Sequence, residues 1–414
     1  MHIENFSFGI GDRFGKEGRV QLRAIQEINR MGAPVVPVWN KSNREHLMVG
    51  SKQSHVAWEA EDAVKANGWT GSFYVDADHI NLGNVEGFLN DSNFFTIDVA
   101  DYIGLPVGET DKQAFVARST ADLKALMLRF EDLDLTDPGG YLNRFADRYL
   151  TALLEVKKIY DYILVRRSGK PFVPEVSMDE VAEPQAPVDL YFILKELKHL
   201  GVEVQTIAPK FSGLFAKGVD YEGDTEHFGR EFEMDVLILQ YAIKTLDLPQ
   251  NLKLSVHSGS DKFSIYPKIR EVILKHGAGI HIKTAGTTWL EEVIGLARGG
   301  MAGLAIAKHI YREALRRYDE LAAPYANVLH IDPNRLPPAE AVLKWKADRY
   351  ARTLTHDPAC SDYNPHFRQL IHISYKIAAE MGGEFLDALG YYRDSVEEQV
   401  YTNLYDRHLK RLFL

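Results

Sequence analysis

The sequence predicts a TIM (β/α)8 barrel with a helical insertion after the fourth strand and a helical C-terminal extension. About eight short runs are rich in β-branched and aromatic residues and end in polar or glycine clusters, as strands do. Amphipathic segments separate most of these runs, which is the alternation of a closed parallel barrel. The expected strands span residues 5–10, 34–39, 72–76, 94–99, 172–177, 203–208, 253–257 and 279–283. The clearest helical segments span residues 19–31, 57–66, 190–200, 230–246 and 268–276.

The structural alternative is an open doubly wound sheet, in which a glycine-rich turn after the first strand binds phosphate. That turn reads GIGDRFGKEG here and contains Gly9, Gly11 and Gly15. The charged residues Asp12 and Arg13 fill the place where the backbone would approach a pyrophosphate. The glycine signal is therefore weak, and the barrel is favoured.

Two segments do not fit the strand–helix repeat. The chain is strongly helical from about residue 121 to 168, and we expect a helical insertion within about 110–170 on the catalytic face of the barrel. From about Trp289 onward the pattern is helical only, with breaks at Pro337-Pro338 and near Asp357-Pro358. These features predict a catalytic barrel over residues 1–300 and a helical extension over 301–414 packed on it.

Composition excludes several classes of protein. The 414 residues are 45% hydrophobic and 26% charged, as in an ordinary globular enzyme. No apolar run approaches the roughly 18 residues that cross a bilayer, and no secretion signal is visible, so we expect a cytoplasmic protein without a membrane partner. A net charge of −10 argues against a nucleic-acid partner. The single cysteine, Cys360, leaves imidazole and carboxylate as metal ligands. Homo-oligomerisation stays open.

Two histidines follow expected strands directly, and barrel enzymes place their working residues at such strand ends. His79 follows the third strand and His257 ends the seventh. Two neutral imidazoles and one carboxylate would hold a divalent cation and leave positions open for substrate oxygens. We expect Asp224 to supply the carboxylate, with Glu222 and Asp78 as alternatives. His227 and His281 are competing ligands. The ion could be zinc, manganese, nickel or cobalt.

Other charged strand-end residues predict acid/base and substrate-binding roles. Asp78 and Glu180 are candidates for acid/base catalysis, because burial near a bound substrate can tune a carboxyl group toward neutrality. Lys210, Lys262 and Lys283 lie among many carboxylates, which favours charged ammonium groups over a Schiff base. For Lys262 the alternative is a surface ion pair. The full expected substrate-binding set is Arg13, Glu175, Ser177, Lys210, Asp261, His281 and Lys283, with a buried structural ion pair as the alternative for Glu175.

Five motifs give the chain a recognisable signature. They are FYVDADHINL, EVSMDE, APKFSG with KGVDYEGD, SVHSGSDKFSIYP and HIKTAGTT. Together they resemble the tagaturonate/fructuronate epimerase family, and SVHSGSDKFS is the most specific of them. The resemblance covers the barrel and the helical tail.

The resemblance implies a divalent-metal-dependent enzyme that interconverts D-tagaturonate and D-fructuronate in hexuronate catabolism, or the related ketohexoses fructose and tagatose. It implies His79, Asp224 and His257 as metal ligands. The implied acid/base pair is Asp78 with Glu180. For the last residue, Glu183 and Glu175 are alternatives, and His227 is the alternative to Asp224.

The two sugars differ at a carbon β to the ketone, whose C–H bond the carbonyl does not acidify. A retro-aldol route avoids breaking that bond, since the adjacent C–C bond opens and the ketone half becomes a metal-bound enediolate. A class II-type aldolase or a ketose isomerase acting on a sugar acid would use the same ligands. A carbohydrate-binding or regulatory barrel without catalysis is the third reading, which the acidic and histidine-bearing strand ends disfavour.

Overall fold

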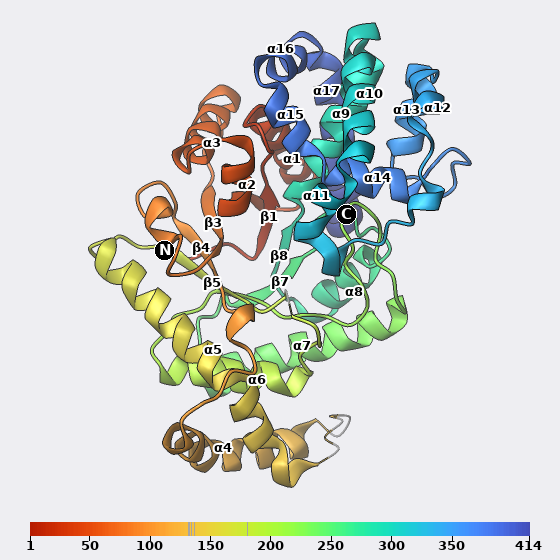
Figure 1. The fold of residues 1–414 in the computed structure, drawn as a ribbon. Coiled ribbons are helices and arrows are strands. Elements are labelled where there is room, and N and C mark those ends of the chain that lie inside the picture. The colour runs from red at the N-terminus through yellow and green to blue at the C-terminus, as the bar shows by residue number, and fades with distance from the viewer. Residues whose placement is uncertain (131–132, 134, 136, 180) are drawn as a thin grey trace.

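Eight parallel strands form a closed barrel in the computed structural model, which describes residues 1–130, 133, 135, 137–179 and 181–414. Each strand pairs with the next along the chain, and β8 pairs with β1 to close the ring (Figure 1). The predicted barrel is confirmed. The strands are β1 Phe6–Ile10, β2 Val35–Ser42, β3 Tyr74–Ile80, β4 Phe94–Asp98, β5 Val173–Ser177, β6 Thr206–Ala208, β7 Lys253–His257 and β8 Ile280–Lys283.

Helices surround the ring and continue past it. Between the strands lie α1 Gly18–Arg30, α2 Asn43–Val49, α3 Ser54–Asn67, α4 Glu109–Arg129, α5 Pro138–Arg166, α6 Pro187–His199, α7 Thr225–Thr245 and α8 Tyr266–His276. After β8 come α9 Thr288–Gly299, α10 Met301–Arg316, α11 Tyr318–Ala322, α12 Ala339–Leu343, α13 Ala347–Leu354, α14 Pro365–His372, α15 Tyr375–Met381, α16 Gly383–Tyr391, α17 Arg393–Tyr401 and α18 Lys410–Phe413, with a π-helical segment at Thr402–Leu409.

The barrel interior changes from apolar to charged along its axis. One end is filled by a cluster that includes Val36, Tyr74, Phe94 and Val173. Because side chains alternate along a strand, residues two further on also point inward, and these are polar in β3, β4 and β5. Their buried side chains meet Lys283 of β8. The polar end is the carboxyl end of the strands, where barrel enzymes bind substrate.

The insertion after β4 does not lie on the catalytic face, contrary to expectation. Helix α5 packs against β4 and α6, so it takes the place of an ordinary barrel helix, and α4 packs outside it (Figure 1). Phe115 of α4 stacks on Phe145 of α5 at 5.0 Å between ring centroids. Burial of that apolar stripe holds α4 on the outer surface, and neither helix lines the cavity described below.

The C-terminal helices share a core with the last barrel helix. Trp289 and Val293 of α9 are buried with Tyr311, Tyr350 and Phe367 of the later helices. This core crosses the expected boundary at residue 300. Further on, α17 packs against α9 and α1, and α18 packs against α8. The extension is therefore anchored on the first barrel helix, α1, and on the last two, α8 and α9.

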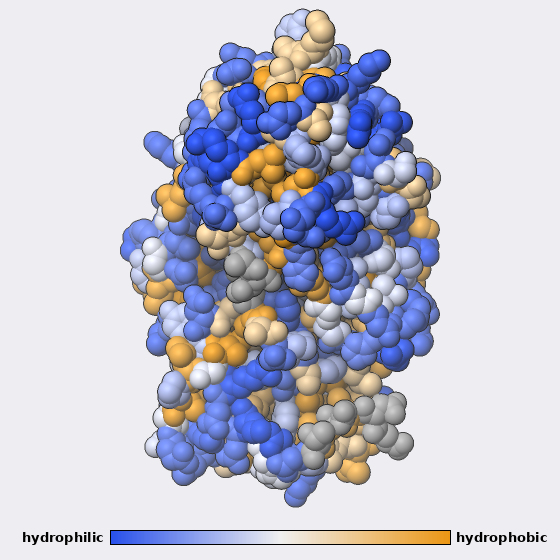
Figure 2. All heavy atoms as spheres, turned by 45° about the vertical axis from the view of Figure 1, so that its right-hand side comes forward, coloured by the Kyte–Doolittle hydropathy of each residue, from blue (hydrophilic) through white to orange (hydrophobic). Residues whose placement is uncertain are grey.

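The surface in Figure 2 carries mostly hydrophilic side chains, with apolar residues in small groups between them. Within the described part of the chain, no helix has the length and apolar character needed to cross a membrane.

Candidate active site

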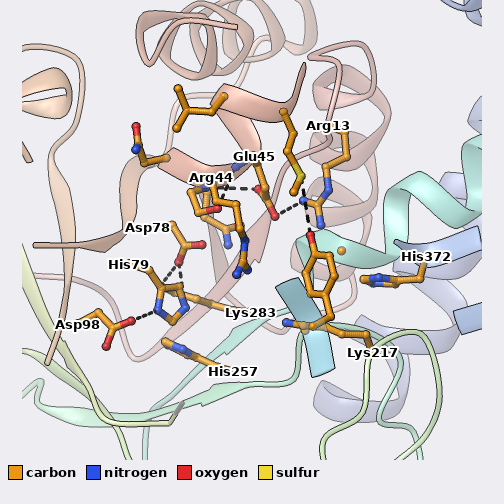
Figure 3. Close-up of a pocket in the computed structure, with 18 of the residues that line it drawn as sticks. Arg13, Arg44, Glu45, Asp78, His79, Asp98, Lys217, His257, Lys283 and His372 are labelled. Carbon is orange, nitrogen blue, oxygen red and sulfur yellow. Dashed lines mark hydrogen bonds and ion pairs between the residues drawn. The ribbon is translucent and has the colours of Figure 1, made fainter. Parts of the chain in front are cut away.

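A cavity of about 680 Å³ opens at the carboxyl ends of the strands (Figure 3). Asp78, His79, Asp98 and His257 lie on one side of it, and residues from the β1–α1 loop, the loop after β6 and the C-terminal extension lie on the other. Its volume is in the range that holds a small ligand. The cavity therefore joins the barrel mouth to the helical extension.

His79 reaches this cavity through an irregularity in β3. Asp76 and Asp78 point into the barrel, whereas Ala77 packs against the surrounding helices. Simple alternation would send His79 outward with Ala77. Instead, the pairing of β3 with β4 shifts register between Ala77 and Ile80, and His79 has a φ of 52°. This left-handed conformation is uncommon outside glycine and marks functional sites. It turns the imidazole toward the mouth.

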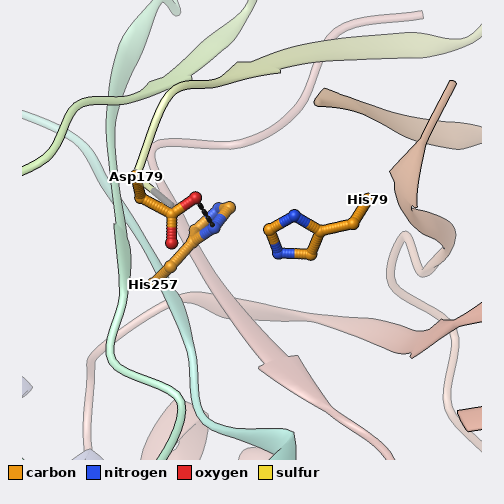
Figure 4. A group of neighbouring side chains, drawn as sticks. All are labelled: His79, Asp179 and His257. Carbon is orange, nitrogen blue, oxygen red and sulfur yellow. Dashed lines mark ion pairs between the residues drawn. The ribbon is translucent and has the colours of Figure 1, made fainter. Parts of the chain in front are cut away.

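His257 lies opposite His79, with the two ring centroids 5.3 Å apart. Nε2 of His257 contacts Oε1 of Glu175 at 2.8 Å, and Nδ1 lies 3.2 Å from Oδ1 of Asp179. Ser177 donates a hydrogen bond from Oγ to the same Asp179 carboxylate. One ligand atom from each of His79, Asp179 and His257 falls within 4.8 Å of the others (Figure 4). These three side chains can share one ion.

The orientation of each ring suits a divalent cation. Asp98 lies 2.8 Å from Nδ1 of His79, so Nε2 remains for an ion. Glu175 contacts Nε2 of His257, so Nδ1, which faces Asp179 at 3.2 Å, remains for an ion. A carboxylate behind each imidazole is the usual outer support of a metal-binding histidine. Imidazole nitrogens with one carboxylate match zinc and related divalent metals. The residues fit such an ion.

The carboxylates around His79 and His257 also favour positive charge at this site. Burial would lower the pKa of His257, but Asp179 and Glu175 outweigh it and raise the pKa to about 9. Burial likewise opposes protonation of His79, and Asp78 with Asp98 raises its pKa well above the usual value. A site that holds protons this strongly between carboxylates is a site that a cation can occupy in their place.

Lys283 forms the base of the mouth. Its Nζ lies 2.8 Å from Asp76, 2.9 Å from Asp78 and 2.8 Å from Glu175. Burial would lower the pKa of Lys283, but these three carboxylates raise it well above its usual value. For Asp78, burial would raise the pKa, and Lys283 followed by His79 outweighs burial and lowers the pKa to about 2. Asp78 is thus a carboxylate and Lys283 an ammonium group at neutral pH, and the expectation that burial tunes Asp78 toward neutrality is wrong.

The structure corrects the expected third ligand. Asp224 is exposed and caps α7, where its carboxylate accepts hydrogen bonds from the backbone of Glu226 at 2.8 Å and His227 at 3.1 Å. The alternatives Glu222 and His227 are exposed too, and none of these side chains lines the cavity. The carboxylate that lies within 4.8 Å of a ring nitrogen of each histidine is that of Asp179.

Several expected substrate-binding residues are buried structural groups instead. Asp261 is fully buried with Arg368, His356 and His408, 2.8 to 3.1 Å away. His281 lies deeper in the barrel against Ser7, and burial lowers its pKa to about 3.

Of the remaining predicted residues, some support other side chains and others line a cavity. Lys262 is not on the surface, since its buried Nζ donates to the carbonyls of Ala216 and Val219. Glu175 and Ser177 hold His257 and Asp179, as described above, and do not line the cavity. Arg13 and Lys283 do line it, and Lys210 lines an adjoining cavity. Glu180 lies outside the described residues, and its alternative Glu183 is exposed.

Sequence reasoning missed residues that only the fold brings to the mouth. Asp179 stands in the EVSMDE motif, next to the predicted acid/base residue Glu180, and its own sequence context does not distinguish it from the other acids at strand ends. Asp98 at the end of β4 carried the strand-end signal without a role. His372 of α14 and Tyr325 come from the extension, where no strand-end pattern marks them.

The closed barrel and its polar mouth define a TIM-barrel enzyme with a small-molecule site. Residues 1–412 match the family described as tagaturonate epimerase, and the chain belongs to this family. A tagaturonate/fructuronate epimerase from Thermotoga maritima is 29% identical over 387 residues, which cover 89% of this chain and 72% of that protein. The predicted family and enzyme class are confirmed: the chain is an epimerase, and so an isomerase.

Solved structures support the same fold. The native structure of the fructuronate-tagaturonate epimerase UxaE from Cohnella laeviribosi has a TM-score of 0.78 and 24% sequence identity, covering 100% of this chain and 82% of that one. A glycerol complex of the same enzyme gives the same values. The likeness extends over the helical extension as well as the barrel.

Proposed function

We propose that the chain interconverts D-tagaturonate and D-fructuronate, or the related ketohexoses, in a divalent-metal-dependent retro-aldol reaction. The family assignment supports the substrate pair. The single observation that carries the metal dependence is the convergence of His79, Asp179 and His257 in the cavity.

His79, Asp179 and His257 would hold the ion. When bound, a divalent cation supplies Lewis-acid stabilisation of negative charge on substrate oxygens. Asp98 and Glu175 fix the orientation of the two imidazoles, so the ligand geometry is set before any ion or substrate arrives.

Asp78 is the proposed base, because it is ionised and lines the cavity beside His79. It takes the proton from the hydroxyl on C4, C4 becomes an aldehyde, and the C3–C4 bond breaks with its electron pair passing to the ketone half. The positive Lys283 lies next to this charge and stabilises it. Glu180, beside Asp179, remains the predicted second acid/base group.

Epimerisation then requires the aldehyde half to present its other face before the bond forms again. The two halves balance the hexuronate: dihydroxyacetone as its enediolate and a three-carbon aldehyde acid. The proton returns to the new C4 oxygen when the bond closes. No proton leaves a carbon in this route, which avoids the barrier at the unactivated C4–H bond.

Elemental analysis of the purified protein, with activity measured before and after chelation, tests the metal requirement. We expect chelation to abolish turnover and one added cation to restore it, whereas full activity in a metal-free sample would refute the proposal. Product analysis by NMR after incubation with D-fructuronate separates the alternatives. The epimerase gives tagaturonate, an aldolase accumulates three-carbon fragments, and a ketose isomerase moves the carbonyl group.

A further inference from the structure

The side of the cavity away from His79 contains a buried histidine that none of the chemistry above uses. His372 ends α14 and is 3% exposed, yet neither of its ring nitrogens has a hydrogen-bond partner among the described residues. The ring lines the cavity and points into it (Figure 3). Buried polar groups in folded proteins nearly always have a hydrogen-bond partner, so an unpartnered one in a cavity indicates a missing ligand.

The backbone opposite His372 is shaped to leave that space open. Gly286 follows β8, and a Cβ there would lie 2.9 Å from Nε2 of His372 and 2.4 Å from the carbonyl oxygen of Gly259. Any larger residue at position 286 would collide with both. Glycine at position 286 therefore avoids a side chain against Nε2 of His372.

The charges around His372 are positive. Burial lowers its pKa well below the usual value, and Arg13 and Lys217 on the cavity side lower it further, as do Arg368 and Lys262 behind it. His372 is therefore a neutral imidazole that can donate one N–H. Arg368 is neutralised by Asp261 at 2.8 Å. Of the two positive groups on the cavity side, Arg13 is paired with Glu45 at 2.7 Å, and Lys217 has no ion pair in the described part of the chain.

Lys217 and Arg13 differ in how they are held. Arg13 is fixed by Glu45 at 2.7 Å and stacks over Tyr375 at 4.9 Å. Lys217 is half-buried, and its ammonium group forms no ion pair within the described part of the chain. An ammonium group that faces a cavity together with an unpaired imidazole and a fixed guanidinium is a site for an anion.

We propose that Lys217, His372 and Arg13 bind the carboxylate of the substrate and make the enzyme select sugar acids over neutral ketohexoses. This inference rests on the proposed function, since it places the carboxylate of the hexuronate at the end of the cavity opposite the metal ligands. Lys217 supplies the unpaired charge, His372 donates a hydrogen bond, and Arg13 adds a fixed positive group. A neutral hydroxymethyl group in the same place would leave the positive charge unbalanced.

The location also bears on the reaction. In the retro-aldol step the carboxylate stays on the aldehyde half, which consists of C4, C5 and C6. If C6 is held by Lys217 and His372, the formyl group can turn about the C4–C5 bond while its fragment remains bound. Lys217, His372 and Arg13 therefore retain the aldehyde fragment that an aldolase would release.

The test compares Lys217→Met and His372→Phe with Lys376→Met as the matched control. Lys376 lines the same cavity, but its Nζ is already paired with Glu320 at 2.7 Å. We expect the ratio of kcat/KM for D-fructuronate to that for D-fructose to fall about 10- to 100-fold in the first two variants, as for loss of a charged hydrogen bond. The control ratio should stay within about twofold of wild type. Thermal unfolding establishes that each variant is folded.

Equal losses on the acid and the neutral sugar in Lys217→Met would overturn the inference, because that variant changes a half-buried residue without emptying the core. Failure of the proposed function would give a different experimental result. If the wild-type protein turns over neither sugar, calorimetry with D-fructuronate still decides: binding that is lost in Lys217→Met and kept in Lys376→Met supports the carboxylate site. Binding that is equal in all three proteins refutes it.

Discussion

Replacement of Asp179 by Asn tests the corrected ligand set against the one expected from sequence. The change keeps the shape of the side chain but removes the charge that lies 3.2 Å from Nδ1 of His257. Loss of an outer supporting carboxylate already weakens metal binding about 10- to 100-fold, so loss of a direct anionic ligand should exceed about 100-fold. That factor corresponds to about 2.7 kcal/mol of binding free energy.

The comparison variant is Asp224→Ala. Asp224 accepts two backbone hydrogen bonds at the start of α7, and loss of such a helix cap costs about 1 kcal/mol of folding stability. Its metal affinity should match wild type. Asp179→Asn should instead weaken metal binding. It should also cost some stability, because burial would raise the pKa of Asp179 but His257 and His79 outweigh it and lower the pKa, so the ionised form stabilises the fold.

Competition titration with a chromogenic chelator measures the affinity, and urea unfolding measures the stability. The ligand assignment would be refuted if Asp179→Asn bound metal like wild type while Asp224→Ala lost it. Equal metal affinity in all three proteins would show that neither carboxylate is a ligand.

Three further changes follow from buried contacts. Asp98→Asn removes the charge that holds Nδ1 of His79 at 2.8 Å and should weaken metal binding about 10- to 100-fold by the same titration. Glu292→Gln should stabilise the fold increasingly as the pH rises above about 4.5, the ordinary pKa of the group, because burial raises the folded-state pKa and only the unfolded chain then loses its proton. Urea midpoints at pH 5 and pH 8 measure this difference. Asp261→Asn leaves the buried Arg368 without its carboxylate and should cost about 3–5 kcal/mol of unfolding free energy.

Each of these has a contradicting result. Unchanged metal affinity would exclude the supporting role of Asp98. A Glu292→Gln effect that shrinks as the pH rises would mean that this carboxyl group is ionised in the fold, and the exposed Glu398→Gln serves as its control. A loss under about 1 kcal/mol in Asp261→Asn would mean that the buried ion cluster is not needed to hold the extension.

The barrel could be predicted because its signals are local. Runs of β-branched and aromatic residues between amphipathic helices mark each strand, and the strand-end rule then brings His79 and His257 together although they are far apart in sequence. The rule does not say how a loop folds after its strand. Asp179 and Asp224 both follow strands, but Asp179 lies two residues after β5 and stays near His257, whereas Asp224 caps the start of α7.

Burial by distant segments was not predictable from local pattern. Asp261 follows a strand and is polar, as a substrate-binding residue would be. It becomes buried only because Arg368, 107 residues later, and two histidines of the extension close over it. His372 shows the converse: it lies on an amphipathic helix with no catalytic signature and reaches the cavity through the packing of that helix on α9. Contacts between segments that are far apart in the chain leave no pattern in the local sequence.

The position of α14 has a consequence for biosynthesis. Domains often begin to fold from the N-terminus while the ribosome is still at work. Here all eight barrel strands have been synthesised once the chain reaches residue 283. Residue 372 must still be synthesised and packed before the cavity is complete. A nascent chain stalled between those points would present an open, charged mouth without the imidazole. The cavity is therefore completed late in the synthesis and folding of each chain.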